Sequence, residues 1–432
     1  MTRTAAREPV DFIEQGLPRR PTYGTLWRAL STTVAAQNGR LPALDAWLDH
    51  QFRSTRSFGS RDRREIRDTF FHVFRVLEPL VLEHEPSRHA AEQLAPCQVA
   101  SAALALPWEE LVSLWDKIRS NDDSLAQLVE RASIPSAYRS ALEDRARLSE
   151  WTNHQSELFV ISQLQAAPLW IRCNRARLDA AALREKLSQE GVVVTACDGD
   201  ALQVAAQKSL YETAAFREGC FEIQDAASQD IGRACLTALE SQGPSEQAPQ
   251  IWDVCAGAGG KSLQIASALG GRGAVYATDI RARALDECQI RAARAGLHNI
   301  RTKVWDGLTP PGLPRAVARN GGFDVVLVDA PCSSSGTWRR NPESRYRFAG
   351  SDITRFAATQ LDLLRRAAPR VKPGGFLVYG TCSWLPAEDE HVIDAFLALT
   401  EGSLFRRDSG RLCGLPDRNS DAMYCAVMRR TD

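Results

Sequence analysis

The sequence predicts an α/β protein built on a doubly wound, mostly parallel sheet, preceded by a helical region and a small α+β module. From residue 251 onward, short apolar runs typical of strands alternate with amphipathic helical stretches, which is the pattern of a parallel sheet covered by helices. Residues 1–150 show apolar side chains at three- and four-residue spacing without strand patterns. We therefore expect a helical domain over 1–150, an α+β module over 151–240 and the doubly wound domain over 241–432.

Composition bounds the class of protein. The chain has 432 residues, 44% hydrophobic and 25% charged, with a formal net charge of +0, so affinity for a polyanion must come from local patches. Its 11 cysteines form neither a CxxC motif nor a Cys/His cluster, which favours reduced thiols and no metal site. Without a signal peptide or an apolar run of ~18 residues, we expect a cytoplasmic monomer that does not enter a membrane.

The helical region contains an arginine-rich stretch over residues 53–75, with seven arginines against three acids. Four phenylalanines are interleaved with the arginines: Phe58, Phe70, Phe71 and Phe74. One interpretation is a solvated helix face over an aromatic core. The alternative is a helix face that contacts RNA.

The expected α+β module has two strand-like runs, 167–174 and 192–197, on either side of a helical run, 178–191. Gly191 is placed to end that helix. A third strand then leads into a helix over 221–236, and the polar, proline-containing stretch 240–250 predicts a loop.

The doubly wound domain has a strand pattern at six places. These are residues 251–255, 274–279, 300–305, 323–329, 376–380 and 423–428. The helical stretches between them are 262–269, 281–296, 353–368 and 386–400. Open α/β sheets bind ligands at the carboxyl ends of their strands, so the residues that follow each strand are the candidate site.

The first of these strand ends is a glycine-bearing turn, DVCAGAGGKS, at 253–262. Glycines let the backbone approach a ligand, and the following helix offers unpaired amides. The turn matches neither GxxxxGK[ST] nor GxGxxG, so alone it is also compatible with a purely structural turn. The candidate cofactor contacts here are Cys255, Ala256, Gly257, Ala258, Gly259, Gly260 and Lys261.

Acids at the next strand ends strengthen the prediction of a nucleoside cofactor. Asp279 follows Gly259 by 20 residues, where a carboxylate accepts both ribose hydroxyls. Asp306 ends the third strand, where an acid accepts the amino group of an adenine. The missing phosphate loop favours S-adenosylmethionine, which carries no phosphate. For each acid, a helix N-cap is the alternative role.

Two cysteines follow later strands at equivalent places, Cys332 in DAPC and Cys382 in TCS. Carbon 5 of a pyrimidine accepts a methyl group only after a thiolate has added to carbon 6, which makes the ring an enamine. Asp329 is placed to protonate N3 of such a ring. One cysteine can attack while the other assists release; the alternative is that both are small fillers at strand ends.

These residues resemble the RNA 5-methylcytosine methyltransferases, especially the bacterial 16S ribosomal RNA type. The motifs that carry the resemblance are DVCAGAGGK, Asp279, Asp306, DAPCSSSGTWRRNP and YGTCSWLPAEDE. The resemblance covers roughly 160–432 strongly, and the arginine-rich stretch 53–75 resembles, more weakly, a degenerate antitermination-factor (NusB-type) domain. One departure is Ala258, where the family commonly has proline.

The resemblance implies a Rossmann-like class I methyltransferase fold, S-adenosylmethionine as cofactor and an RNA cytosine as substrate. It implies Cys382 as the nucleophile and Cys332 as the residue that assists release. Residues 255–261, Asp279, Asp306 and Asp329 would line the cofactor and base site. Two roles stay open for Lys261: it faces the base, or it stabilises the loop.

The expected function is therefore methylation of cytosine in 16S ribosomal RNA. The alternatives are a transfer RNA or small-molecule methyltransferase, and a non-catalytic RNA-binding assembly factor. The target base must leave its stack, so single-stranded or loop RNA is expected. The stretch 338–348, with four arginines and three aromatics, is either a solvated loop or, with this family context, a contact for RNA phosphates and bases.

Overall fold

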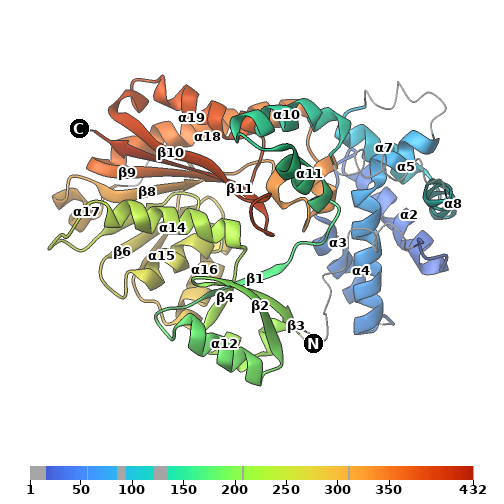
Figure 1. Ribbon diagram of the computed structural model, residues 1–432, viewed down its shortest axis with the longest axis horizontal. Coiled ribbons are helices and arrows are strands. Elements are labelled where there is room, and N and C mark those ends of the chain that lie inside the picture. Colours follow the sequence, from blue (N-terminus) through green and yellow to red (C-terminus); the bar gives the residue numbers. More distant parts are fainter. Residues whose placement is uncertain are drawn as a thin grey trace. The chain divides into compact units, whose positions relative to one another are not determined.

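The computed structural model describes residues 16–55, 57–84, 94–120, 134–206, 209–309 and 312–431 (Figure 1). Arg56 of the arginine-rich stretch lies outside them. The chain divides into two compact units, one of residues 1–166 with 333–353 and one of residues 167–332 with 354–432. The chain therefore enters the first unit directly after Cys332 and leaves it again at 353.

The first unit is helical, as predicted, and none of its described residues lies in a strand. Its α-helices are α2 (Pro21–Ala36), α3 (Leu44–Ser54), α4 (Ser60–Arg75), α5 (Leu77–His84), α7 (Pro96–Ala105), α8 (Trp108–Arg119), α10 (Arg139–Leu148) and α11 (Asn153–Ser162). An aromatic cluster lies at its centre, where the rings of Phe70 and Trp108 stack with centroids 6.1 Å apart. Segment 333–353 adds two 3₁₀ turns, Ser335–Thr337 and Pro342–Tyr346, and Tyr346 is buried in the same core.

The second unit contains a four-stranded antiparallel sheet with the strand order β2-β3-β1-β4. Its strands are β1 (Leu169–Cys173), β2 (Val192–Asp198), β3 (Ala201–Ala206) and β4 (Phe221–Ile223). Helix α12 (Ala180–Gln189) packs on this sheet through Leu183 and Leu187. Asp179 caps its first turn by accepting a hydrogen bond from the Ala182 amide, and the helix ends before Gly191, which has a φ of +76°.

The larger sheet of the second unit has seven strands in the order β10-β11-β9-β8-β5-β6-β7. They are β5 (Gln250–Asp253), β6 (Ala274–Asp279), β7 (Ile300–Val304), β8 (Phe323–Asp329), β9 (Val371–Thr381), β10 (Phe405–Gly414) and β11 (Ala422–Arg430). Strands β5 to β9 pair with one another in parallel, whereas β11 pairs antiparallel with β9 and β10 pairs antiparallel with β11. This confirms the predicted doubly wound, mostly parallel sheet.

Alternate residues of β8 show how helices cover both faces of this sheet. Val325 and Leu327 belong to a core with α14 (Ala226–Glu240), α15 (Gly260–Ala268) and α16 (Ala282–Ala295). Val326 and Val328 belong to another core with α17 (Arg315–Arg319), α18 (Gly350–Ala367) and α19 (Glu390–Leu397). Figure 1 shows α14 and α15 on one side of the strands and α18 and α19 on the other.

The order of the strands reverses between β5 and β8, which makes a crevice at their carboxyl ends the expected ligand site. Within the part of the chain that the structure describes, no helix is long and apolar enough to cross a membrane.

Candidate active site

The glycine turn follows β5 and leads into α15. Gly257 and Gly259 have φ values of +54° and +84°, in the left-handed region that favours glycine. At Gly259 there is also no room for a side chain, since a Cβ would lie 2.3 Å from the Cys288 sulfur and 2.6 Å from Leu263 Cδ1. The fold itself therefore requires glycine at 259, because the turn passes directly over α16.

Asp279 lies at the end of β6 and is joined to this turn. Its Oδ2 accepts a hydrogen bond from the Gly257 amide at 2.8 Å. Its Oδ1 accepts from the amide and the Nε of Arg281 at 2.9 and 3.0 Å. Burial alone would raise the pKa of Asp279, but these hydrogen bonds outweigh it and lower the pKa, so the carboxylate is charged.

Asp306 lies two residues beyond β7, at the same edge of the sheet. The Trp305 amide donates to the Asp279 carbonyl at 3.1 Å, which links the ends of β6 and β7. The Asp306 carboxylate is exposed and accepts a hydrogen bond from the Leu308 amide at 2.8 Å. It closes its own turn and is not a helix N-cap, since α17 begins only at Arg315.

Asp329 ends β8 and forms an ion pair with Lys261 of α15. The two side chains meet at 2.6 Å between Nζ and Oδ2. Burial lowers the pKa of Lys261, but the carboxylate of Asp329 outweighs this and raises it, so the lysine is an ammonium. The Lys261 side chain thus points to the end of β8.

The two predicted cysteines lie together at the ends of β8 and β9. These strands pair in parallel as far as Asp329 opposite Gly380, and the Ala330 amide donates to the Gly380 carbonyl at 2.9 Å. Just beyond, the sulfurs of Cys332 and Cys382 are 3.2 Å apart. Cys332 is buried and Cys382 is half-buried.

Residues 239–409 match the family described as 16S rRNA methyltransferase RsmB/F. This segment, which contains the glycine turn, the three acids and both cysteines, is similar to that family. The ribosomal RNA small subunit methyltransferase B of Enterobacter sp. (strain 638) is 33% identical over 277 residues, which cover 63% of this chain and 59% of that protein. The chain thus spans less than two thirds of the length of this curated relative.

Solved structures support the fold. The crystal structure of PH0851 has a TM-score of 0.68 at 21% identity, covering 96% of this chain and all of that one (100%). NSun6 from Pyrococcus horikoshii, solved with SFG, has a TM-score of 0.53 at 18% identity and covers 68% of this chain and 98% of that one. At these identities the likeness establishes a shared fold.

Two arginines that were not predicted hold the carbonyl groups of the glycine turn. Arg291 Nη1 donates to the Ala258 carbonyl and Arg172 Nη1 to the Gly260 carbonyl, each at 2.8 Å. We call Arg172 and Arg291 the arginine clamp. Glu222, which is 2% exposed, accepts hydrogen bonds from Arg291 and Arg294. The clamp residues come from β1 and α16, so no local sequence pattern connects them with the turn.

Asp253, at the end of β5, was also missed as a site residue. Its Oδ2 accepts a hydrogen bond from the Ser262 hydroxyl at 2.6 Å, whereas its Oδ1 is buried with no hydrogen-bond partner among the described residues. Burial raises the pKa of Asp253 to about 7, although the Ser262 hydroxyl opposes this shift. The carboxyl group of Asp253, next to the glycine turn, is therefore protonated over a wider pH range than a carboxyl group in water.

Two arginines of the stretch 338–348 differ from both of its predicted roles. Arg339 and Arg345 are 1% and 0% exposed, so neither lies in a solvated loop nor reaches RNA phosphates. Arg339 Nη2 donates to the Ala166 carbonyl at 3.0 Å, and Arg345 donates to the carbonyl of Gln163. Arg75 in turn donates to the Arg339 carbonyl at 2.8 Å. Backbone oxygens of the helical unit thus accept a hydrogen bond from each of these guanidinium groups, which offsets part of the cost of their burial.

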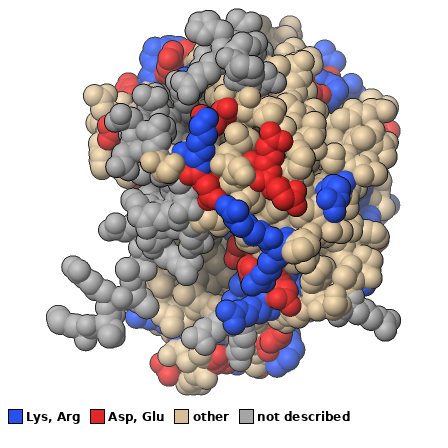
Figure 2. Space-filling view, turned by 90° about the vertical axis from the view of Figure 1, so that its right-hand side faces the viewer, with Lys and Arg blue, Asp and Glu red and all other residues tan. Residues whose placement is uncertain are grey.

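The arginine-rich stretch 53–75 comprises the end of α3, the loop that follows it and the whole of α4. Phe70 and Phe74 are buried in the core and Phe58 and Phe71 pack against it, which favours the interpretation as a helix face over an aromatic core. The arginines at 61, 63 and 64 are exposed. On the face drawn in Figure 2, basic side chains lie beside acidic ones.

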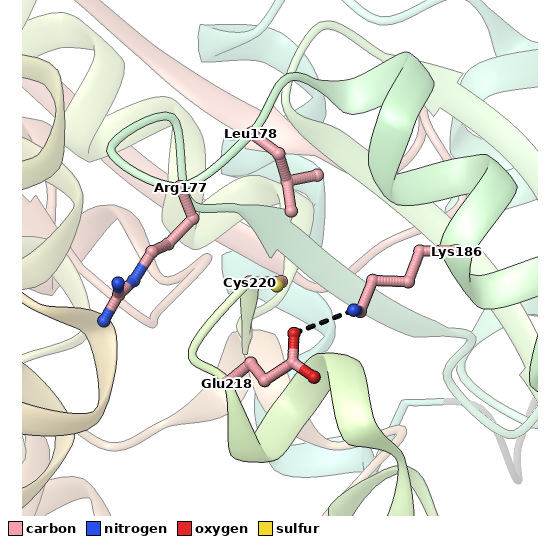
Figure 3. A pocket seen from close by; sticks show the side chains of 5 residues that line it. All are labelled: Arg177, Leu178, Lys186, Glu218 and Cys220. Atoms are coloured by element: carbon pink, nitrogen blue, oxygen red, sulfur yellow. Dashed lines mark hydrogen bonds and ion pairs between the residues drawn. The ribbon is translucent and has the colours of Figure 1, made fainter.

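A pocket in the small module contains none of the predicted site residues. It is lined by Arg177, Leu178, Lys186, Glu218 and Cys220 (Figure 3). Its lysine is already paired with Glu218 at 2.7 Å. The candidate active site is therefore the strand ends of the larger sheet.

Proposed function

We propose that the protein is an S-adenosylmethionine-dependent methyltransferase that modifies carbon 5 of a cytosine in 16S ribosomal RNA, through a covalent adduct with Cys382. The match of residues 239–409 to the RsmB/F family supports ribosomal RNA as the substrate. The single observation that carries the cysteine chemistry is the pair of sulfurs, 3.2 Å apart, at the strand end next to the Lys261–Asp329 ion pair.

The residues at the strand ends fit S-adenosylmethionine. The glycine turn gives close backbone approach, and the charged carboxylate of Asp279 suits the ribose hydroxyls. Arg281 is bonded to that carboxylate but is 69% exposed, so it can move aside for a ligand. Asp306 would accept the adenine amino group. A structural relative was solved with SFG, an analogue of this cofactor. When bound, S-adenosylmethionine supplies an electrophilic methyl group on a sulfonium.

The residues of the chain perform the remaining steps. The Cys382 thiolate adds to carbon 6, and the proton that N3 needs comes from Asp329, with the Lys261 ammonium 2.6 Å away as its source. The electron pair displaced by this addition makes carbon 5 nucleophilic toward the methyl group. Cys332, as thiolate, then removes the carbon 5 proton, the ring double bond re-forms, and the bond from carbon 6 to the Cys382 sulfur breaks. N3 returns its proton to Asp329.

The proposal is tested by bisulfite sequencing of RNA from cells with and without the gene. We expect one or more 16S ribosomal RNA cytosines to lose protection from bisulfite when the gene is absent, and to regain it with the wild-type gene but not with Cys382→Ala. Loss of protection in a transfer RNA alone would move the substrate to transfer RNA. No change in any RNA would refute the methyltransferase proposal.

A further inference from the structure

We infer that Gln360, Glu388 and Ser383 form a buried brace that sets the separation of the Cys332 and Cys382 sulfurs. The brace residues act as positioning residues for the reaction proposed above, on which this inference rests. All three side chains are 0% exposed, and the brace joins the loop after β8 to the loop after β9.

Gln360 of α18 holds the first loop. Its single Nε2 group donates to the Pro331 carbonyl at 3.0 Å and to Glu388 Oε1 at 3.2 Å. The amide nitrogen carries two hydrogens, so these two bonds use its full donor capacity. Pro331 directly precedes Cys332 in the chain, which places one end of the brace one residue from a sulfur.

Glu388 holds the second loop. Its Oε2 accepts a hydrogen bond from the Ser383 hydroxyl at 2.7 Å, and Ser383 directly follows Cys382. The Ser383 oxygen also accepts from the Leu385 amide at 3.0 Å, and the Tyr379 hydroxyl donates to the Glu388 carbonyl. The carboxylate is thus held from both sides and cannot turn away without leaving buried polar groups unpaired.

The brace connects the two loops beyond the point where hydrogen bonds between β8 and β9 end. The ladder between β8 and β9 ends at Asp329 opposite Gly380, followed by one further bond from the Ala330 amide. Beyond that point the chain path of both cysteines depends on contacts of their loops. The bonds from Pro331 through Gln360 and Glu388 to Ser383 connect the two loops directly. A displacement of about 1 Å can cost roughly 100-fold in rate when reacting groups must be aligned. Loss of the brace should therefore lower the rate of the reaction.

The separation of the sulfurs can be measured without RNA or cofactor, by the rate at which a diazene such as diamide oxidises them to a disulfide. The two thiols give up two electrons and two protons, an S–S bond forms, and the diazene is reduced to the hydrazine. The bond requires the sulfurs to approach from 3.2 Å to about 2.05 Å, so its rate reports their placement. Peptide mass spectrometry identifies the Cys332–Cys382 link.

The main variant is Gln360→Met, which removes both donors at similar side-chain volume. The matched control is Thr359→Met, the same new residue at an exposed neighbouring position of α18. In the full-length protein we expect the disulfide to form at least 10-fold more slowly in Gln360→Met and within twofold of wild type in Thr359→Met. Ser383→Ala, which removes a single hydroxyl, should shift the rate in the same direction by a smaller factor. It provides the test if Gln360→Met fails to fold.

The kinetic counterpart is a split between kcat and KM. Methyl transfer by Gln360→Met should lose at least 10-fold in kcat, while the KM values for RNA and S-adenosylmethionine stay within twofold, because the three brace residues are fully buried and none is among those proposed to contact the cofactor. Wild-type disulfide rates in both Gln360→Met and Ser383→Ala would overturn the brace, even if these variants melt at lower temperature. A wild-type protein that forms no such disulfide would overturn it as well. Since the disulfide test needs no RNA, a failure of the proposed function would leave this result unaffected.

Discussion

The sulfurs of Cys332 and Cys382 lie 3.2 Å apart although 50 residues separate them in the sequence. The parallel pairing of β8 with β9 produces this proximity, because each cysteine follows the carboxyl end of its strand. Carbons 5 and 6 of a pyrimidine are bonded neighbours, so two sulfurs at this spacing can serve both atoms of one ring. In the proposed reaction, Cys382 attacks carbon 6 and Cys332 removes the proton from carbon 5.

Single substitutions should separate these roles. We expect Cys382→Ala to form no covalent adduct with RNA and to show no measurable methyl transfer, because nothing adds to carbon 6. Cys332→Ala should still attack and methylate once, but release slowly and accumulate a protein–RNA complex. The measurement is a denaturing gel of each variant with substrate RNA and S-adenosylmethionine.

The two variants control for one another, since each removes one thiol from the same cluster and a general loss of stability would act on both alike. An adduct in Cys382→Ala together with none in Cys332→Ala would reverse the assignment. Methylation without an adduct in either variant would exclude covalent catalysis.

The sequence predicted the strand ends well because the apolar runs that precede them are buried on both faces of the sheet. It thereby located Asp279, Asp329 and both cysteines. It missed β10, whose middle residues are exposed and polar and which pairs only with β11 at the edge of the sheet. A strand of this kind lacks the hydrophobic signal that marks the others.

Long-range partners account for the other differences. Arg345 occurs in a charged stretch that reads as a surface loop, and its burial depends on carbonyl groups nearly 200 residues earlier, such as that of Gln163. Gln360 and Glu388 likewise acquire a role only through the loops that they connect. The residue types in a short stretch of sequence do not reveal contacts with distant parts of the chain. The prediction of RNA-binding arginines at 338–348 was therefore wrong for Arg339 and Arg345, which are buried.

Asp279→Ala should weaken binding of S-adenosylmethionine by about 10- to 100-fold, since a hydrogen bond to a charged group contributes roughly 1.5–3 kcal/mol. The variant also loses the bond to the Gly257 amide, which helps to shape the turn. Isothermal calorimetry on the full-length protein measures the change. Asp286→Ala, which removes an exposed carboxylate of α16, is the control and should bind as wild type does. Unchanged affinity in Asp279→Ala would rule out its role at the ribose.

The arginine clamp predicts a second effect on cofactor binding. Arg291→Met leaves the Ala258 carbonyl without its guanidinium partner, so the turn loses part of its preorganisation and affinity for S-adenosylmethionine should fall about 3- to 10-fold, equivalent to roughly 1 kcal/mol. RNA affinity should not change. Calorimetry with the cofactor and filter binding with RNA give the two quantities.

Arg294→Met is the matched control for this variant. Arg294 also pairs with Glu222, at 2.5 Å, and is 19% exposed against 16% for Arg291, but it makes no bond to the glycine turn. Its substitution should therefore leave cofactor affinity within twofold of wild type. An equal loss of cofactor affinity in both variants would mean that the effect comes from the broken ion pair with Glu222 and not from the glycine turn.

The exposed arginines of α4 allow a test of RNA contact by the helical unit. If Arg61, Arg63 and Arg64 neutralise phosphates, replacing all three with glutamine should lower RNA affinity and flatten its dependence on salt. The slope should fall by about 0.7–0.9 for each phosphate that is no longer neutralised. Turnover at saturating RNA should persist. An identical salt slope in variant and wild type would establish a solvated helix face.

The buried carboxyl of Asp253 makes stability depend on pH. Its pKa is about 7 in the folded protein and ~3.9 in an unfolded chain, so between pH 4 and 7 the folded state holds a proton that the unfolded state has lost. The free energy of unfolding therefore decreases as pH rises through this window, by an amount on the order of a few kcal/mol, and the loss is complete above pH 7.

Asp253→Asn keeps the shape of the side chain and removes its ionisation, so it should abolish this component. We expect the difference in Tm between variant and wild type to shift in favour of the variant from pH 5 to pH 8, as measured by calorimetric melting. Ser262→Ala provides the opposite change. Its hydroxyl stabilises the ionised carboxylate at 2.6 Å, so removing it should raise the pKa of Asp253 further and extend the destabilisation to higher pH. Parallel Tm curves for Asp253→Asn and wild type from pH 5 to 8 would mean that Asp253 is ionised throughout, with a pKa well below 7.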